Sequence, residues 1–487
     1  MNIGFRQKLL HKLLIFSQTR SIGDANTNVF PRQLFLHDRG YVPTLGPPEI
    51  TKILRLHESS LTSNKRGSSP IKGYDSNQLN ANNPMEDRRM QARLLNTDGV
   101  LFGVLDGHAG PSCAESVSQR LLDYIALALL PSSKLEDFIK RPFTLIKEHK
   151  MKCVQDCIDD ISSSHRANLQ KFASETLSAS DWDDEDEDPV AKALISAYIR
   201  LDANIGHDGL PKDGKLDGES LAIAMSGSCG CVAHISDLDV HVANVGDTRG
   251  VLGSLAADGN WTAKILTKEH NYDNKSEVDR ILSAHPKSEE KFVLRDRRLL
   301  GQLVPLRSFG DMRYKWQSNR LQEVVNLINS PAASRLIPPY YHTPPYLICT
   351  PEVGNHRLTV RDRFLVLASD GLWDMLSADK VVQIVGNFLM GKETNTNFEL
   401  PADDRSLLKI VTLLKDRRAR IKHRTEDENA STHLIRHALG YDHKLVSEML
   451  ALPEDVARLH RDDITVTVIF FDSDYIARKA AAEVKNA

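Results

Sequence analysis

Three apolar runs, far apart in the chain, each adjoin an aspartate, and this pattern limits the fold more than any other feature. The run at 101–105 leads into Asp106, the run at 364–368 is followed by Ser369 and Asp370, and Asp462 stands just before the alternating run at 464–470. Runs of this length and composition predict buried strands. Carboxylates at rigid strand ends can converge at one edge of a sheet and hold hard divalent cations, so the sequence predicts metal-ion chemistry.

Asp-Gly by itself is a weak signal, because the chain contains seven such pairs and most lie in polar turn contexts. The pairs that begin at Asp106 and Asp370 differ, because an apolar strand delivers each carboxylate. A following glycine also lets a backbone carbonyl approach a bound ion without a Cβ in the way. For either pair alone a turn explains the sequence as well as a ligand does. Together with Asp462 and the acidic pair at 86–87, a metal site is favoured.

The composition is that of an ordinary globular chain and excludes several classes of protein. Hydrophobic residues make up 41% of the 487 residues and charged residues 26%. No run approaches the ~18 apolar residues of a membrane span, so a transmembrane protein is not expected. A net charge of -3 gives no field that attracts nucleic acid, which disfavours a nucleic-acid partner and a metal-dependent nuclease or phosphodiesterase. The six cysteines lack zinc-site spacing and predict reduced thiols.

The first 24 residues differ in kind from the rest. Basic residues are spread among apolar ones, and no acid appears before Asp24. An amphipathic, acid-free segment of this kind predicts a mitochondrial transit segment over 1–24, with a disordered or surface-lying basic N-terminus as the alternative. Residues 25–70 are rich in Pro, Asn and Ser and predict an extended connector with one short helix near 48–57.

From residue 71 onward, short strands alternate with amphipathic helices. We expect a hairpin around 96–99, helices over 112–130 and 189–205, and an antiparallel meander of three strands between 230 and 255. Two bunches of strands with helices between them predict an α+β fold, a four-layer αββα sandwich of two stacked, mainly antiparallel sheets flanked by helices. One domain would cover 71–475, followed by a C-terminal tail at 476–487, with long insertions at about 131–188, 285–345 and 391–425.

The turn at 246–249 joins the last two strands of the predicted meander. It contains Asp247 and Arg249, which we interpret as an ion pair that locks the turn and not as functional residues. The acidic run at 181–188 repels itself and is interpreted as a solvated surface loop, with a calcium or basic-partner site as the less favoured alternative.

Six ordered motifs resemble those of the metal-dependent serine/threonine protein phosphatases, the PPM or type 2C family. The resemblance covers about residues 71–473, and an accidental match of six motifs in order is improbable. The motifs are Met85-Glu86-Asp87-Arg88, Val104-Leu105-Asp106-Gly107-His108-Ala109-Gly110, Ser226-Gly227-Ser228, Ala243-Asn244-Val245-Gly246-Asp247-Thr248-Arg249, Leu367-Ala368-Ser369-Asp370-Gly371-Leu372-Trp373-Asp374 and Arg461-Asp462-Asp463-Ile464-Thr465.

This resemblance implies roles for the acidic residues. Asp106 resembles the family's carboxylate that bridges two Mg²⁺ or Mn²⁺ ions. The carbonyl of Gly107 would complete one metal site, and Asp370 with Asp462 would complete the other. Two such cations lower the pKa of a shared water and neutralise phosphate charge, so that hydroxide can attack phosphorus in line.

The resemblance also assigns residues around the two ions. Glu86 and Asp87 would hold metal-bound waters. His108 follows the bridging ligand by two residues, so it would lie near the leaving oxygen and act as the general acid.

Two departures from the family pattern affect the expected site. Many relatives carry a phosphate-clamping arginine where this chain has Asn82, so phosphate contacts would fall to that position, to the metals, or to a donor such as Arg88 or Arg89. Several relatives carry an aspartate where this chain has Ala224. A third metal, with Asp374 as one ligand, is therefore not expected.

A narrower resemblance points to the pyruvate dehydrogenase phosphatase branch of the family. It rests on stretches in or beside the insertions, at 78–82, 285–289, 338–346, 429–437 and 452–454. It implies a mitochondrial matrix enzyme that dephosphorylates serine on the alpha subunit of pyruvate dehydrogenase and so activates the complex. It also implies docking to the lipoyl domain of the dihydrolipoyl acetyltransferase core, with Ca²⁺ at that partner interface, and pairing with a regulatory subunit.

Two alternatives to that function remain. One is a phosphatase of this family for another mitochondrial phosphoprotein. The other is a non-catalytic, phosphatase-like binding module, which would be expected to lack one of Asp106, Asp370 or Asp462. All three are present.

Overall fold

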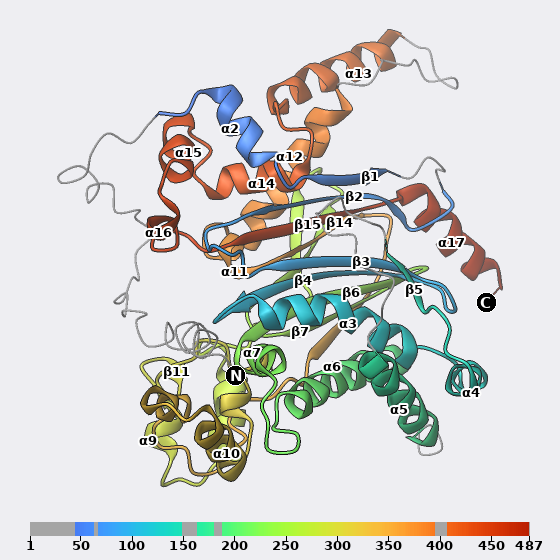
Figure 1. The fold of residues 1–487 in the computed structure, drawn as a ribbon. Coiled ribbons are helices and arrows are strands. Elements are labelled where there is room, and N and C mark those ends of the chain that lie inside the picture. Colours follow the sequence, from blue (N-terminus) through green and yellow to red (C-terminus); the bar gives the residue numbers. More distant parts are fainter. Residues whose placement is uncertain (1–43, 63–66, 149–162, 180–187, 395–406, 487) are drawn as a thin grey trace.

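Two sheets lie face to face in this molecule, with helices covering both outer faces (Figure 1). The computed structural model describes residues 44–62, 67–148, 163–179, 188–394 and 407–486. The predicted four-layer αββα sandwich is confirmed. The predicted transit segment lies outside the described residues, as do parts of the predicted connector and of the first and third insertions, including most of the acidic run.

The six-stranded sheet contains two of the three apolar runs. Its strands are, in spatial order, β1 (Ser59–Thr62), β2 (Ile71–Leu79), β15 (Ile464–Phe471), β14 (Asp362–Ala368), β8 (Arg249–Leu255) and β9 (Trp261–Ile265). All neighbouring strands are antiparallel. Ala368 at the end of β14 pairs with Val466 near the start of β15. Asp370 and Asp462 therefore leave the sheet at the same edge.

The seven-stranded sheet contains the third apolar run. Its strands are, in spatial order, β13 (Glu352–Arg357), β7 (Asp239–Val245), β6 (Gly227–Ser236), β4 (Val100–His108), β3 (Arg88–Leu94) and β5 (Ile146–Glu148), with the short β12 (Phe309–Gly310) paired to β6. The predicted hairpin around 96–99 is confirmed as β3 and β4. Asp106 lies near the end of β4, two residues before the strand ends.

The predicted three-stranded meander is wrong in one respect. β6 and β7 do pair, but β8 leaves them and joins the other sheet, where it lies between β14 and β9. Gly246, with φ of +90°, allows the chain to turn at this crossing. All three strands are largely buried, so their side-chain pattern does not distinguish one sheet from the other.

Helices cover the two sheets on opposite sides and enclose three layers of apolar side chains. The seven-stranded sheet is covered mainly by α3 (Ser112–Ala128) and α6 (Pro189–Asp208), with α4 (Ser132–Lys140), α5 (Ser163–Ala179) and α7 (Gly218–Met225) beside them. The six-stranded sheet is covered by α12 (Ala378–Glu393) and α14 (Ala430–Ala438), with α2 (Pro47–Leu54), α13 (Leu407–Arg420), α15 (His443–Leu450) and α16 (Glu454–Ala457) further out. The predicted helices at 112–130 and 189–205 correspond to α3 and α6.

The second predicted insertion, at about 285–345, is built from short helices and strands. After α8 (Lys275–Ala284) it folds into a series of short elements whose apolar residues join the core beneath the seven-stranded sheet. These elements are α9 (Glu290–Val293), β10 (Leu294–Arg295), β11 (Arg298–Leu299), β12, η3 (Met312–Tyr314), α10 (Ser318–Ile328) and η4 (Pro331–Leu336). Of these, α9, β11 and α10 lie together at the lower left of the molecule in the view of Figure 1, whereas β12 pairs with β6 in the sheet.

The fold also extends past both ends of the predicted domain. Ile50 and Leu54 of α2 are buried, and β1 pairs with β2, so part of the predicted connector belongs to the sandwich. Residues 476–486 of the predicted tail belong to α17 (Ser473–Asn486), where Ile476 is buried. Among the described helices, none has the length and apolar character needed to cross a bilayer.

Candidate active site

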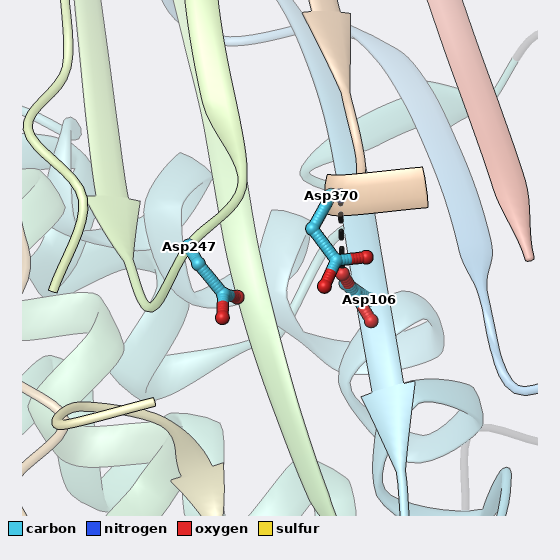
Figure 2. Close-up of side chains that lie close together, drawn as sticks. All are labelled: Asp106, Asp247 and Asp370. Carbon is cyan, nitrogen blue, oxygen red and sulfur yellow. Dashed lines mark hydrogen bonds between the residues drawn. The ribbon is translucent and has the colours of Figure 1, made fainter. Parts of the chain in front are cut away.

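Three carboxylates meet where the two sheets come together. Oxygens of Asp106, Asp247 and Asp370 all lie within 4.8 Å of one another (Figure 2). Asp106 comes from β4 of the seven-stranded sheet, and Asp370 begins α11 (Asp370–Trp373) just after β14 of the six-stranded sheet. The backbone N–H of Asp370 donates to Oδ2 of Asp106 at 3.3 Å. Each sheet therefore supplies one of the two strand-end aspartates that the sequence singled out.

The charges of these carboxylates oppose one another. Burial, followed by the charge of Asp370, raises the pKa of Asp106 well above its usual value. Burial and the charge of Asp247 do the same for the pKa of Asp370. Burial also raises the pKa of Asp374, one helical turn further on, to about 6. Divalent cations remove such repulsion, and clustered carboxylate oxygens are the donors that Mg²⁺ and Mn²⁺ prefer.

Asp87 gives a second sign that the site is built for a positively charged group. The side chain is only 2% exposed, and in the part of the chain that the structure describes its Oδ2 has no hydrogen-bond partner. Burial and the charge of Asp463 raise the pKa of Asp87 well above its usual value. A buried, unpartnered carboxylate oxygen is costly unless a donor or a cation reaches it, so the residues present fit the ions that the sequence predicted.

Asp247 is the residue that the sequence interpretation assigned wrongly. Its predicted partner, Arg249, instead forms an ion pair with Glu269. The turn is held by His270. Its ring Nδ1 accepts from the backbone N–H of Gly246 at 3.1 Å, and its backbone N–H donates to the carbonyl of Gly246 at 2.8 Å. The turn therefore needs no Asp247–Arg249 pair, and the Asp247 carboxylate lies beside those of Asp106 and Asp370 instead.

A signal for Asp247 was present in the sequence. It follows the last residue of β7 by two positions, just as Asp370 follows the last residue of β14 by two positions. The expected meander concealed this parallel, because it placed the turn within one sheet and not at the crossing between the two.

Asp462 lies beside the three-carboxylate group without belonging to it. Its charge contributes to the raised pKa of both Asp106 and Asp370, which places it in their neighbourhood. Asn82, predicted as a phosphate contact, donates through Nδ2 to Oδ1 of Asp462 at 3.2 Å. Asn82 thus orients Asp462 in this structure, and a phosphate contact from it stays a prediction.

Asp463, to which the sequence assigned no role of its own, fixes the loop that carries Glu86. Its Oδ1 accepts from the backbone N–H groups of Ala81 and Asn82 at 2.6 and 2.8 Å, and its Oδ2 accepts from Glu86 N–H at 2.8 Å. The side chain is 1% exposed. A carboxylate that receives three backbone donors is a strong structural clamp, so Asp463 holds the predicted water-binding loop against β15.

Glu86 faces the end of β4. Its Oε1 accepts from the N–H of Gly110 at 2.5 Å, and burial raises the pKa of Glu86 to about 7. A Cβ at Gly107 would lie 2.3 Å from the carbonyl oxygen of Glu86. Only glycine fits at 107, because the Glu86 carbonyl occupies the place of a side chain, and the carbonyl ligand at Gly107 stays a prediction.

The remaining predicted residues have different surroundings. Nε2 of His108 lies 2.6 Å from Oδ2 of Asp311, a residue of the second insertion that the sequence did not single out. Arg88 forms an ion pair with Glu115, and its Nη1 donates to the carbonyls of Met85 and Asp87 at 2.9 and 2.7 Å. These contacts favour a structural role for Arg88, and its phosphate contact stays a prediction.

The fold and this acidic site define a metal-dependent protein phosphatase, and the chain belongs to the family described as Protein phosphatase 2C, whose model matches residues 152–442. It is 40% identical to human [pyruvate dehydrogenase [acetyl-transferring]]-phosphatase 1, mitochondrial, over 89% of this chain and 84% of the relative. It is 39% identical to the human phosphatase 2 of the same name, with the same coverage of each chain. A solved serine-threonine phosphatase 2C from Toxoplasma gondii is 18% identical, with a TM-score of 0.45, over 85% of this chain and 99% of that one.

Proposed function

We propose that this enzyme acts in the mitochondrial matrix, where it removes phosphate from phosphoserine on the alpha subunit of pyruvate dehydrogenase and so activates the pyruvate dehydrogenase complex. The meeting of Asp106, Asp247 and Asp370 at the junction of the sheets carries the proposal for the chemistry. The substrate and the compartment rest on the names of relatives that are 40% and 39% identical over most of this chain.

In this proposal Asp106, Asp370 and Asp462, together with the backbone carbonyl of Gly107, would hold two Mg²⁺ or Mn²⁺ ions. Asp247 lies close enough to Asp106 and Asp370 to join them. When bound, the two ions would supply an oxygen nucleophile at neutral pH and neutralise the phosphate. The carboxylates hold the site ready for that charge, because desolvation and mutual repulsion raise the pKa values of Asp106 and Asp370.

Three residues of the chain then handle water and protons. Glu86 and Asp87 accept hydrogen bonds from the attacking water and orient it toward phosphorus. His108 donates a proton to the serine oxygen as the phosphorus–oxygen bond breaks. The products are serine and inorganic phosphate, and no phosphorylated side chain of the enzyme is required.

Phosphate release from phosphorylated pyruvate dehydrogenase, with Mg²⁺ or Mn²⁺, tests this function. We expect Asp106→Asn to lower the rate by at least about a thousandfold, because a metal ligand is lost. Asp98→Asn is the matched control, since Asp98 also precedes a glycine but lies exposed in the turn at the other end of β4. Equal rates for wild type and Asp106→Asn would refute the mechanism. If the enzyme acted on other mitochondrial phosphoproteins but not on pyruvate dehydrogenase, the proposal that pyruvate dehydrogenase is its substrate would be wrong.

We also propose that the enzyme docks on the lipoyl domain of the dihydrolipoyl acetyltransferase core, with Ca²⁺ at that interface, and pairs with a regulatory subunit. The support is the likeness to phosphatases named for the pyruvate dehydrogenase complex. A pull-down with the isolated lipoyl domain should capture the full chain in Ca²⁺ and lose it in a calcium chelator. Absence of binding under both conditions would contradict the docking proposal.

A further inference from the structure

A buried carboxylate from the second insertion holds the histidine of the active site. Asp311 is 0% exposed, and its Oδ2 lies 2.6 Å from Nε2 of His108. The hydroxyl of Ser308 donates to the same oxygen at 2.7 Å, and the backbone N–H of Asp311 donates to the carbonyl of Ser226 at 2.9 Å. No pattern in the sequence assigned a role to Asp311, which lies more than two hundred residues from His108.

The backbone around Asp311 is held in an uncommon conformation. Asp311 has φ of +52° and Gly310 has φ of +65°, both in the left-handed region. A residue with a side chain stays there only when its surroundings fix it. Here the N–H of Gly310 donates to Oδ1 of Asp202 at 2.9 Å, and Lys315 binds both oxygens of Asp202 and the carbonyl of Ser308. This network sets the position of the Asp311 carboxylate.

The glycine of Ser226-Gly227-Ser228 makes room for the contact. A Cβ at Gly227 would lie 2.1 Å from Nε2 of His108 and 2.2 Å from Oδ2 of Asp311. The strand register explains this closeness, because Gly227 on β6 pairs with His108 on β4 and with Gly310 on β12. Three strands therefore place the histidine, its carboxylate partner and the gap between them.

We propose that Asp311 is a positioning residue for His108, and this inference rests on the general-acid role in the proposed function. By accepting a hydrogen bond from Nε2, Asp311 fixes the plane of the ring and leaves Nδ1 as the nitrogen that serves the substrate. The Nδ1 proton passes to the serine Oγ as its bond to phosphorus breaks, and the bonding electron pair stays on that oxygen. The ring keeps its Nε2 proton against Asp311 throughout this step.

Two substrates with different leaving groups test the role. A serine oxygen needs a proton as it leaves, whereas p-nitrophenolate leaves without one. We therefore expect Asp311→Asn to lower kcat/KM for a phosphoserine peptide by about a hundredfold or more, and to change kcat/KM for p-nitrophenyl phosphate by less than about threefold. Calorimetry should show unchanged Mn²⁺ affinity, and ¹⁵N NMR of the His108 ring should show loss of the hydrogen-bonded Nε2 proton.

The matched control is Asp362→Asn. Asp362 is also a buried partner of a histidine, 2.9 Å from Nε2 of His356, but it begins β14 and lies at the opposite end of that strand from Asp370. For this variant, kcat/KM should stay unchanged for both the phosphoserine peptide and p-nitrophenyl phosphate. Equal losses on both substrates for Asp311→Asn, or no loss on phosphoserine, would overturn the inference. A wild type inactive on both substrates would instead overturn the proposed function.

Discussion

At the scale of single residues, the active site depends on several side chains whose positions could not be predicted from their spacing in the sequence. Asp247, Asp311 and Asp463 stand 141, 205 and 357 positions after Asp106, yet each lies in or beside its site. Asp106 and Asp370 were predictable because an apolar strand precedes each one. Asp311 was not, because its position depends on two consecutive left-handed residues that no periodicity reveals.

Asp247 provides a test at this scale. Asp247→Asn removes one charge from the three-carboxylate group, so we expect the Mn²⁺ affinity to fall about 10- to 100-fold, as losses of groups that support a metal site do. Isothermal titration calorimetry measures this directly, and kcat should fall with it. Asp258→Asn is the control, because Asp258 lies in the turn at the far end of β8. An unchanged affinity in Asp247→Asn would return Asp247 to a purely structural role.

At the scale of elements, the crossing between β7 and β8 is the connection that most affects function. It carries the chain from one sheet to the other and places Asp247 beside the adjoining pair Asp106 and Asp370. His270 holds this crossing by two hydrogen bonds to Gly246. Because Gly246 N–H donates to Nδ1 of His270, that nitrogen must be unprotonated, and the ring proton lies on Nε2.

This geometry predicts an acid-sensitive turn. Burial lowers the pKa of His270 to about 3, below the 6.5 of an unfolded histidine. The unfolded chain therefore binds the proton first, so the stability from this residue is complete above pH 6.5 and is lost progressively as pH falls toward 3. Between pH 7 and pH 5 we expect the free energy of unfolding of wild type to fall by about 2 kcal/mol more than that of His270→Gln, as measured by urea unfolding.

An exposed histidine supplies the comparison for that measurement. His443→Gln changes the first residue of α15, which is exposed, and should leave the pH dependence of the unfolding free energy as in wild type. Identical pH profiles for wild type and His270→Gln would contradict a neutral, buried His270.

The fold class could be predicted because its signals are local. The apolar runs at 364–368 and 464–470 and the amphipathic helices corresponding to α3 and α6 identify themselves by period and length. The sheet to which β8 belongs could not be predicted, because a strand buried on both faces has the same pattern in either sheet. The elements of the second insertion could not be predicted, because its helices and strands are short and no period repeats long enough to be recognised.

At the scale of the whole molecule, the two sheets meet at a site of like charges, so metal binding and stability should be linked. Ions held by Asp106 and Asp370 would join the layers, and any ligand that binds only the folded state raises its stability. We expect Mg²⁺ or Mn²⁺ to raise the melting temperature of wild type and a chelator to lower it, measured by differential scanning calorimetry.

Asp106→Asn should be less stabilised by metal than wild type, but more stable than wild type when no metal is present. Burial raises the pKa of Asp106 in the folded state above its value in the unfolded chain. The unfolded chain therefore loses this proton first, and the folded state becomes less stable as pH rises from the unfolded pKa toward the folded pKa. In chelator at pH 7 the variant should therefore be more stable than wild type, by ~1 kcal/mol, and added metal should no longer raise its melting temperature. A chelated variant less stable than chelated wild type would show that repulsion at Asp106 is not the dominant effect.

The apolar layer between the sheets has a consequence for ion choice. Side chains such as Val104, Leu252 and Leu365 fill this layer and determine its thickness, and therefore how far the β4 end stands from the β14 end. Magnesium accepts little deviation from oxygen distances of about 2.0–2.1 Å, whereas larger cations tolerate more. A substitution that removes a buried methyl group from this layer would change the distance between the ends of β4 and β14, and with it the distance between Asp106 and Asp370. Residues that never touch phosphate would thus help to select the cation.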